Sequence, residues 1–285
     1  MKNIDTALVN RKVEQAAETA ALTENKREVL LECMACTDYT TLKETDSPHS
    51  VTAFTNHAVE LTGQGLPPVA SICVYPSLVD AVGVALTGIP AGSPAENIGI
   101  TAVCGAFPSG QTYMEVKMLE CAMAIENGAD EIDAVINVGA MLSGDYDLAE
   151  SELAMIREEI DGDAVLKVIL ETGSLADPEL IYRASMLAME AGADFIKTST
   201  GKTPISATPA AAVVMCRAIR DFERSCSRRV GIKVAGGIRT PQEAVLYRTI
   251  VAQELGEEWL TPSLFRIGAS RLVDALAPRL LSETV

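Results

Sequence analysis

The sequence predicts an α/β protein, a (β/α)8 TIM barrel with an extra helix at its N-terminus. Short apolar or β-branched runs alternate with amphipathic segments, a Gly-Ala-Asp junction recurs between helix and strand, and 285 residues accommodate eight such repeats. Alternating strands and helices form parallel sheets with right-handed crossovers, and eight units close into a barrel. A doubly wound open sheet is the alternative fold, but no G-x-G-x-x-G follows the first expected strand.

The expected strands are eight short runs rich in apolar and β-branched residues. In chain order they cover residues 31–36, 70–75, 100–105, 131–138, 165–171, 195–200, 231–236 and 265–268. Residues 1–30 precede them and form an expected helical extension, because Val13, Ala16, Ala17 and Ala20 share one helical face. The sequence contains no linker or low-complexity segment, so residues 1–285 are expected to form one domain.

Helices are expected in the gaps between these runs. The main candidates cover residues 111–127, 147–159, 178–191, 209–223 and 241–255. Thr208-Pro209 and Thr240-Pro241 each place a capping threonine before a proline at the first helical position. Gly128 and Gly192 follow two of the candidates, as glycines at helix C-termini commonly do.

The composition limits the classes of partner. A formal net charge of −16 argues against nonspecific binding to nucleic acid or anionic membranes, which requires a basic surface. No apolar run approaches the roughly 20 residues that cross a bilayer, and the polar N-terminus lacks the apolar stretch of a secretory signal. We therefore expect a cytoplasmic protein without a nucleic-acid or membrane partner.

A metal-dependent mechanism is not expected. The two histidines of the chain, His49 and His57, are fewer than the roughly three ligands that a catalytic zinc site usually takes. Cys33 and Cys36 form a C-x-x-C, but no second pair stands at zinc spacing, so we assign them a structural role. The sequence indicates no metal and no cofactor.

Two lysines and one aspartate within expected strands are the main candidates for catalysis. Side chains alternate between the two faces of a strand, so Lys197, Lys233 and Asp133 should point into the barrel, opposite the aliphatic residues beside them. A buried cation is costly and a second cation lowers the pKa of the first, which yields an uncharged amine able to attack carbonyls. Asp133 is then placed to move protons during imine formation. The alternative is a set of buried structural ion pairs.

Further polar residues follow the same strands. Lys167 adds an inward cation, which we place with the substrate-binding residues, and we expect Glu171 on the same strand face to be its ion-pair partner. Loops after the seventh and eighth strands of such barrels commonly bind phosphate through backbone amides. Gly236 and Gly237 stand after the seventh. Positive charge nearby is expected from a lysine and an arginine, Lys202 and Arg239.

In these segments the chain resembles the deoxyribose-phosphate aldolase family, class I aldolases with a (β/α)8 barrel. The matching segments cover residues 36–42, 71–76, 129–133, 166–173, 195–202, 231–240 and 265–270. The resemblance implies reversible cleavage of 2-deoxy-D-ribose 5-phosphate into D-glyceraldehyde 3-phosphate and acetaldehyde, without a cofactor. A related Schiff-base sugar-phosphate aldolase or transferase is the alternative.

The resemblance also implies roles for individual residues. Lys197 matches the Schiff-base lysine of the family, Lys233 the neighbour that lowers its pKa, and Asp133 the proton-transfer residue. The positions that match the family's substrate-binding residues are Asp38, Cys73, Thr200, Lys202, Gly236, Gly237 and Ser270. Family members commonly form dimers, so a homo-oligomer is expected.

The chain departs from the family pattern at two places. Arg271 follows Ser270 where the family often has a second serine. Its guanidinium either binds the phosphate as a charged donor or points into solvent, and the sequence does not distinguish the two. Some members end in a flexible tail with a tyrosine that assists proton transfer, whereas this chain ends in Leu281-Ser282-Glu283-Thr284-Val285. Proton transfer without such a tyrosine is therefore expected.

Overall fold

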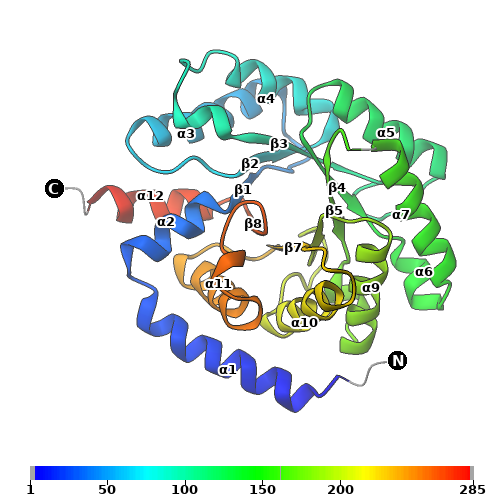
Figure 1. The fold of residues 1–285 in the computed structure, drawn as a ribbon. Coiled ribbons are helices and arrows are strands. Elements are labelled where there is room, and N and C mark those ends of the chain that lie inside the picture. The colour runs from blue at the N-terminus through cyan, green and yellow to red at the C-terminus, as the bar shows by residue number, and fades with distance from the viewer. Residues whose placement is uncertain (1–3, 161, 283–285) are drawn as a thin grey trace.

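Eight parallel strands close into a barrel in sequence order, with helices packed around the outside (Figure 1). The computed structural model describes residues 4–160 and 162–282. Strand β1 pairs with both β2 and β8, which closes the ring. The predicted (β/α)8 fold is confirmed.

The strands are short and nearly all of their residues are buried. They are β1 (Thr37–Thr40), β2 (Ser71–Val74), β3 (Gly99–Cys104), β4 (Glu131–Val135), β5 (Val165–Ile169), β6 (Phe195–Lys197), β7 (Gly231–Ala235) and β8 (Phe265–Ala269). Their outward faces carry aliphatic side chains that pack against the helices, for example Ile132, Ile196 and Ile232, all fully buried. The inward faces carry the buried charged side chains Asp38, Glu131, Asp133, Lys167, Lys197, Lys233 and Arg266.

The helices follow the predicted pattern closely. They are α1 (Thr6–Thr23), α2 (Arg27–Ala35), α3 (Pro48–Gly63), α4 (Val79–Leu86), α5 (Met114–Glu126), α6 (Val138–Ser143), α7 (Tyr146–Ile160), α8 (Thr172–Leu175), α9 (Pro178–Glu190), α10 (Pro209–Cys226), α11 (Pro241–Leu255) and α12 (Leu272–Ser282), with short 3-10 turns at Pro76–Leu78, Pro94–Asn97 and Glu257–Trp259. Thr208 and Thr240 cap α10 and α11 as predicted, each accepting a hydrogen bond from a backbone N–H.

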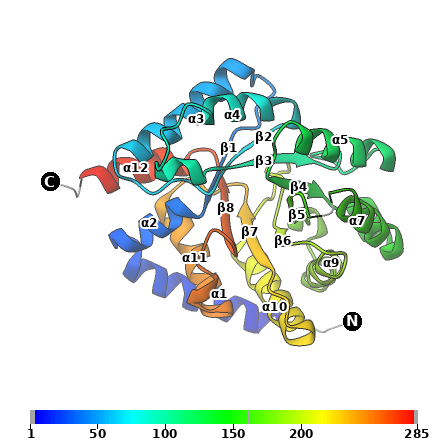
Figure 2. The same ribbon diagram turned by 45° about the horizontal axis from the view of Figure 1, so that its top comes forward.

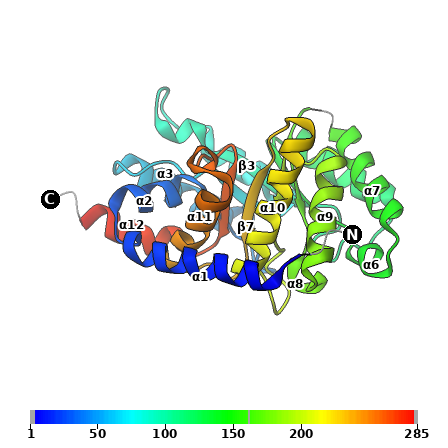
Figure 3. The same ribbon diagram turned by 60° about the horizontal axis from the view of Figure 1, so that its bottom comes forward.

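The extra N-terminal helix is α1, which lies outside the ring of helices. It runs along α10 and α11, as two views of the molecule show (Figures 2 and 3). Val9, Ala16 and Ala20 are its buried residues and Val13 is half-buried, whereas Ala17, also predicted for the apolar face, is exposed.

The prediction of a first strand at residues 31–36 is wrong. That run forms most of α2, in which Val29, Leu30, Cys33 and Met34 are buried at helical spacing. The segment is rich in glutamate, leucine, methionine and alanine, which favour helix over strand. The first strand begins directly afterwards, at Thr37. Predicted strand six also ends early, at Lys197, although the following three residues are buried and the Thr198 N–H still donates to the backbone oxygen of Lys233 at 3.0 Å.

Candidate active site

The two predicted lysines lie side by side within the barrel. Lys197 ends β6 and Lys233 is the central residue of β7, and the two are direct register partners. Both side chains point inward, and Lys233 is fully buried while Lys197 is 3% exposed. The strand-alternation argument therefore placed both amines correctly.

Asp133 on β4 is the carboxylate that both amines contact. Its Oδ2 accepts hydrogen bonds from Lys197 Nζ and from Lys233 Nζ, each at 2.7 Å. Its Oδ1 accepts from Lys167 Nζ at 2.8 Å. Three ammonium groups thus converge on one buried carboxylate, so Asp133 alone cannot neutralise all of them.

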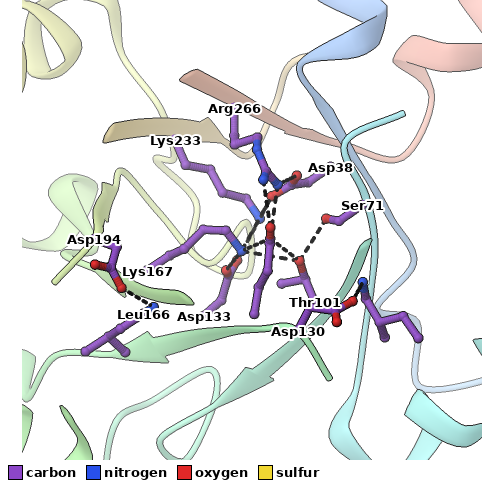
Figure 4. A network of polar contacts seen from close by, with 12 residues as sticks. Asp38, Ser71, Thr101, Asp130, Asp133, Leu166, Lys167, Asp194, Lys233 and Arg266 are labelled. Carbon is purple, nitrogen blue, oxygen red and sulfur yellow. Dashed lines mark hydrogen bonds and ion pairs between the residues drawn. The ribbon is translucent and has the colours of Figure 1, made fainter. Parts of the chain in front are cut away.

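A second group of charges continues the network toward the start of the strands (Figure 4). Asp38 on β1 pairs with Lys233 at 2.5 Å and with Arg266 Nη1 at 2.6 Å. Arg266 on β8 also holds Glu131 on β4, through Nη1 at 3.0 Å and Nη2 at 2.7 Å. The geometry is the paired, charge-assisted arrangement that arginine makes with carboxylates.

Sequence reasoning missed Arg266 and Glu131. Alternation contained the signal for both, because Glu131 shares the inward face of β4 with Asp133, and Arg266 lies opposite the outward Phe265 and Ile267. Thr101 on β3 completes this group by donating to Glu131 Oε2 at 2.8 Å.

The predicted pairing of Lys167 with Glu171 is wrong. Lys167 Nζ lies 2.5 Å from Glu131 Oε2, in addition to its bond with Asp133. Glu171 instead accepts hydrogen bonds from Thr200, at 3.3 Å from the backbone N–H and 2.5 Å from Oγ1, and from Thr203 Oγ1 at 3.1 Å. Lys167 on β5 thus finds its closest carboxylate partners on the neighbouring strand β4, and not in its own segment.

The environment shifts the pKa values of Lys197 and Lys233 in opposite directions. Burial is the main cause that lowers the pKa of Lys197, and the Lys233 ammonium adds to it, while Asp133 opposes both. Burial also disfavours the Lys233 ammonium, but the Asp133 and Asp38 carboxylates outweigh it and raise the pKa of Lys233. Asp133 resists protonation, because despite its burial three ammonium groups hold its pKa well below the usual range. Of these two amines, Lys197 is the one that loses its proton more readily.

A cavity of about 270 Å³ opens at the carboxyl ends of the strands and reaches Lys197. Residues from the loops after β1, β6, β7 and β8 surround it, and those predicted for substrate are Thr200, Lys202, Gly236, Gly237, Arg239 and Ser270. Lys202 Nζ contacts the backbone oxygen of Leu42 across the opening. Gly236 has φ +88, and a Cβ there would meet the Ser206 Cβ at 2.5 Å, so glycine is required.

Three other residues predicted for substrate lie deeper than this cavity. Asp38, Cys73 and Lys167 are fully buried in the barrel and do not belong to the cavity lining formed by the described residues. Cys73 packs against Leu42 and Val103. Arg271 is exposed and also lies outside that lining. The basic side chains of the lining are Lys43, Lys197, Lys202 and Arg239.

Within residues 4–160 and 162–282, no cluster of three or more histidine, cysteine or carboxylate side chains has metal-binding geometry. Over the same residues, every helix is too short or too polar to cross a bilayer. The predicted tail without a tyrosine includes residues 283–285, which lie outside the described residues.

Comparison with known proteins gives the site a family. Residues 34–271 match the model of the DeoC/LacD family aldolases, which covers every strand of the barrel. The chain belongs to this family. The match confirms the resemblance inferred from the lysine segments.

Individual relatives of this aldolase family agree. The chain is 46% identical over 204 residues to a mouse protein named deoxyribose-phosphate aldolase, covering 72% of this chain and 62% of the mouse protein. A bovine protein of the same name is 40% identical over 256 residues, covering 86% of this chain and 78% of the relative. The chain thus spans less than two thirds of the mouse relative.

A solved structure supports the fold alone. The deoxyribose phosphate aldolase from Aeropyrum pernix, described as a tetramer, superposes with a TM-score of 0.69 at 23% identity. The superposition covers 96% of this chain and 97% of that one.

Proposed function

We propose that this chain is a class I aldolase that reversibly cleaves 2-deoxy-D-ribose 5-phosphate into D-glyceraldehyde 3-phosphate and acetaldehyde. The observation that carries the proposal is the charge count of the barrel network. Four basic groups, Lys167, Lys197, Lys233 and Arg266, face three carboxylates, Asp38, Glu131 and Asp133. The network is neutral when one amine is uncharged, and Lys197 is the amine at the cavity.

The chemistry follows from a neutral Lys197. Its Nζ adds to the aldehyde carbon C1 of the open-chain sugar, and the resulting carbinolamine loses water to form an imine. Loss of the proton from the C3 hydroxyl breaks the C2–C3 bond, whose electron pair moves toward the imine nitrogen and gives an enamine and D-glyceraldehyde 3-phosphate. Protonation at C2 and hydrolysis then release acetaldehyde and free Lys197.

Asp133 and Lys233 support these proton transfers. Asp133 Oδ2 lies 2.7 Å from Lys197 Nζ, within reach of the proton that the nitrogen gains or loses. Lys233 stays charged, so it disfavours a second ammonium on Lys197.

The cavity supports a phosphorylated substrate. Lys202 and Arg239 bring positive charge to the opening, and the backbone at Gly236 and Gly237 adopts the left-handed conformation that exposes N–H groups to an anion. Ser270 adds a hydroxyl after β8. Asp38, Cys73 and Lys167 contribute from below, by holding the interior charges and shape.

Trapping tests the proposal. Protein incubated with acetaldehyde and then borohydride should gain one reduced two-carbon adduct on Lys197, found by peptide mass mapping. Lys197→Ala should lose both the adduct and cleavage of 2-deoxy-D-ribose 5-phosphate, while activity should persist in a chelator. Full aldolase activity in Lys197→Ala would exclude the mechanism, and preference for another sugar phosphate would identify a related Schiff-base aldolase.

We also propose a homodimer located in the cytoplasm, without nucleic-acid or membrane partners. An apolar stripe on α5 supports self-association, since Val116, Leu119 and Met123 are each about half exposed. Light scattering of the purified chain tests the dimer.

A further inference from the structure

Arg266 and Glu131 lie beneath the candidate active site and outside its cavity. Glu131 is the first residue of β4 and Arg266 the second of β8, so both belong to the N-terminal half of the barrel. They are 6% and 7% exposed. The Arg266 guanidinium also lies 5.6 Å from the centre of the Phe195 ring, which fills the barrel at that level. Neither side chain can touch a substrate bound at the carboxyl ends of the strands.

The two residues nevertheless belong to the same charge network as Lys197. The titratable groups that face Arg266 are Asp38, Glu131 and Cys36. Those that face Lys197 are Asp133 on β4, Lys233 on β7 and Cys73 on β2. The two halves are joined by Lys167 and Lys233, each of which contacts Asp133 and a carboxylate that Arg266 holds.

The pairing within this network is uneven. Arg266 contacts two carboxylates, Lys233 two and Lys167 three, whereas Lys197 contacts only Asp133 among the described residues. Lys197 also shares that carboxylate with Lys167 and Lys233. It is therefore the least compensated cation, but only while Arg266 occupies Asp38 and Glu131.

We infer that Arg266 is a positioning residue for the reaction: by neutralising Asp38 and Glu131, it keeps one cation in excess and leaves Lys197 as the amine that gives up its proton. The inference rests on the proposed function, because it assigns a cause to the reactivity of Lys197. It reaches beyond that function by placing a determinant of the pH profile at the opposite end of the barrel.

The sign of each substitution follows. Arg266→Met removes a cation and leaves two carboxylates to the lysines, so Lys197 should retain its proton to higher pH. Glu131→Gln removes an anion and should have the opposite effect. Glu131→Gln combined with Arg266→Met removes one charge of each sign, so Lys197 should again lose its proton over the same pH range as in the unmodified chain.

The experiment follows imine formation at Lys197 as a function of pH. The full chain is incubated with acetaldehyde and cyanoborohydride at pH 5 to 9. The amine adds to the carbonyl, water leaves, and hydride from cyanoborohydride reduces the imine to a stable secondary amine. The rate of adduct formation should rise with pH as free Lys197 becomes available. Circular dichroism of each variant checks folding.

The acid limb of the profile is the pH range over which the rate of adduct formation rises. We expect Arg266→Met to move this acid limb up by about one pH unit, so that at a pH within or below it adduct forms about tenfold more slowly. Glu131→Gln should move the limb down, and the double variant should restore it. Lys117→Met is the matched control, because it removes a buried cation from an ion pair with Glu152 outside the barrel. It should leave the limb in place.

The outcomes separate the two proposals. A Lys197 adduct in every variant with unshifted limbs would overturn the role of Arg266 and leave the aldolase proposal standing. No Lys197 adduct in the unmodified chain would overturn both. If Arg266→Met does not fold, the downward shift in Glu131→Gln decides, and an unmoved limb there is sufficient to reject the inference.

Discussion

Asp133 shows most clearly how single residues set the chemistry of this site. Its two oxygens accept hydrogen bonds from three lysines, all of them buried. A buried ammonium is stable only with its own compensating charge, so three of them cannot share one carboxylate on equal terms. Lys167 and Lys233 have second carboxylates and Lys197 does not, within the part of the chain described. Reactivity is thus concentrated on one residue by the pairing of the others.

This unequal pairing predicts that Lys197 lowers stability. Burial lowers its pKa, so at neutral pH the folded state binds that proton less well than the unfolded chain does. Lys197→Met should raise the free energy of unfolding at pH 7 by about 1 kcal/mol while abolishing aldehyde trapping. Urea denaturation followed by circular dichroism measures the change.

Lys233→Met is the comparison for Lys197→Met, because it removes the neighbouring amine in the same way. Lys233 contacts two buried carboxylates, at 2.5 and 2.7 Å, and its loss removes one direct ion-pair partner from each of them. It should lower the free energy of unfolding by about 3 to 5 kcal/mol. Equal destabilisation by the two methionine variants would contradict the unequal pairing.

Among the elements, the turn after β5 organises the cavity. Glu171 has φ +56, a left-handed conformation that is uncommon for a residue with a side chain. Its buried carboxylate holds Thr200, and Thr200 Oγ1 in turn accepts a hydrogen bond from the backbone N–H of Lys202 at 3.1 Å. A strained residue on one loop therefore fixes a basic residue on the next.

Replacing this carboxylate should weaken substrate binding more than imine chemistry. Glu171→Ala removes the acceptor without changing the need for a left-handed backbone, and freeing Thr200 and Lys202 should raise KM for 2-deoxy-D-ribose 5-phosphate about tenfold. Glu171→Gln keeps one oxygen acceptor and should show a smaller rise. Trapping of acetaldehyde on Lys197 should change less than twofold in both. A parallel loss of trapping would contradict this account.

The repeated Gly-Ala-Asp junctions have a structural explanation. Asp130 Oδ2 accepts from the Ile100 N–H at 2.8 Å, and Asp194 Oδ2 accepts from the Leu166 N–H at 2.9 Å. Each aspartate thus satisfies a backbone donor near the start of a neighbouring strand. Asp194 also accepts from Arg157 Nη1 at 2.9 Å.

Because Arg157 contacts Asp194 and not Asp130, we expect the two aspartates to contribute differently to the free energy of unfolding. Asp130→Ala should cost about 1 to 2 kcal/mol of unfolding free energy, and Asp194→Ala about 2 to 3 kcal/mol, because it also leaves Arg157 without this carboxylate. Denaturant titration checks both values. In an Arg157→Met background the two aspartate variants should become equal, and a persistent difference would show that Arg157 is not its cause.

For the whole molecule, local patterns predicted the fold and only part of the site. Alternation of strand and helix predicted the barrel, and the period of two predicted that Lys197, Lys233 and Asp133 point inward, where both lysines contact the aspartate. The segment before Thr37 was mistaken for a strand, since a short apolar run does not distinguish helix from strand.

The ion-pair partners of the buried basic residues could not be predicted from nearby sequence alone. The contacts of Arg266 on β8 with Asp38 on β1 and with Glu131 on β4 exist only once the ring closes. The contact of Lys167 on β5 with Glu131 depends on β4 being its neighbour in the sheet. Sequence proximity suggested Glu171 for Lys167, but the side chains that meet inside a barrel come from different strands. The charge balance that selects Lys197 is therefore a property of the closed barrel.

That balance also predicts how the whole protein responds to acid. The pKa values of Asp38, Glu131 and Asp133 all lie below their ordinary range, because the surrounding cations outweigh the effect of burial. A carboxylate with a lowered folded-state pKa stabilises the protein above its unfolded pKa of about 4, and this contribution is lost as pH falls further. Above that range, protonation of surface acids relieves the repulsion of a chain with net charge −16.

The two effects together predict a stability curve with a sharp acid edge. The free energy of unfolding should hold or rise slightly from pH 7 to about 5, and should then fall steeply below about 4, with each of the three carboxylates contributing up to about 1.4 kcal/mol per pH unit. Guanidinium denaturation at pH 7 to 3 measures the curve. Glu131→Gln with Arg266→Met removes one carboxylate and should reduce the slope of the acid edge by about one third. A steady decline already between pH 7 and 5, or an acid slope unchanged in the double variant, would show that the barrel network does not govern acid unfolding.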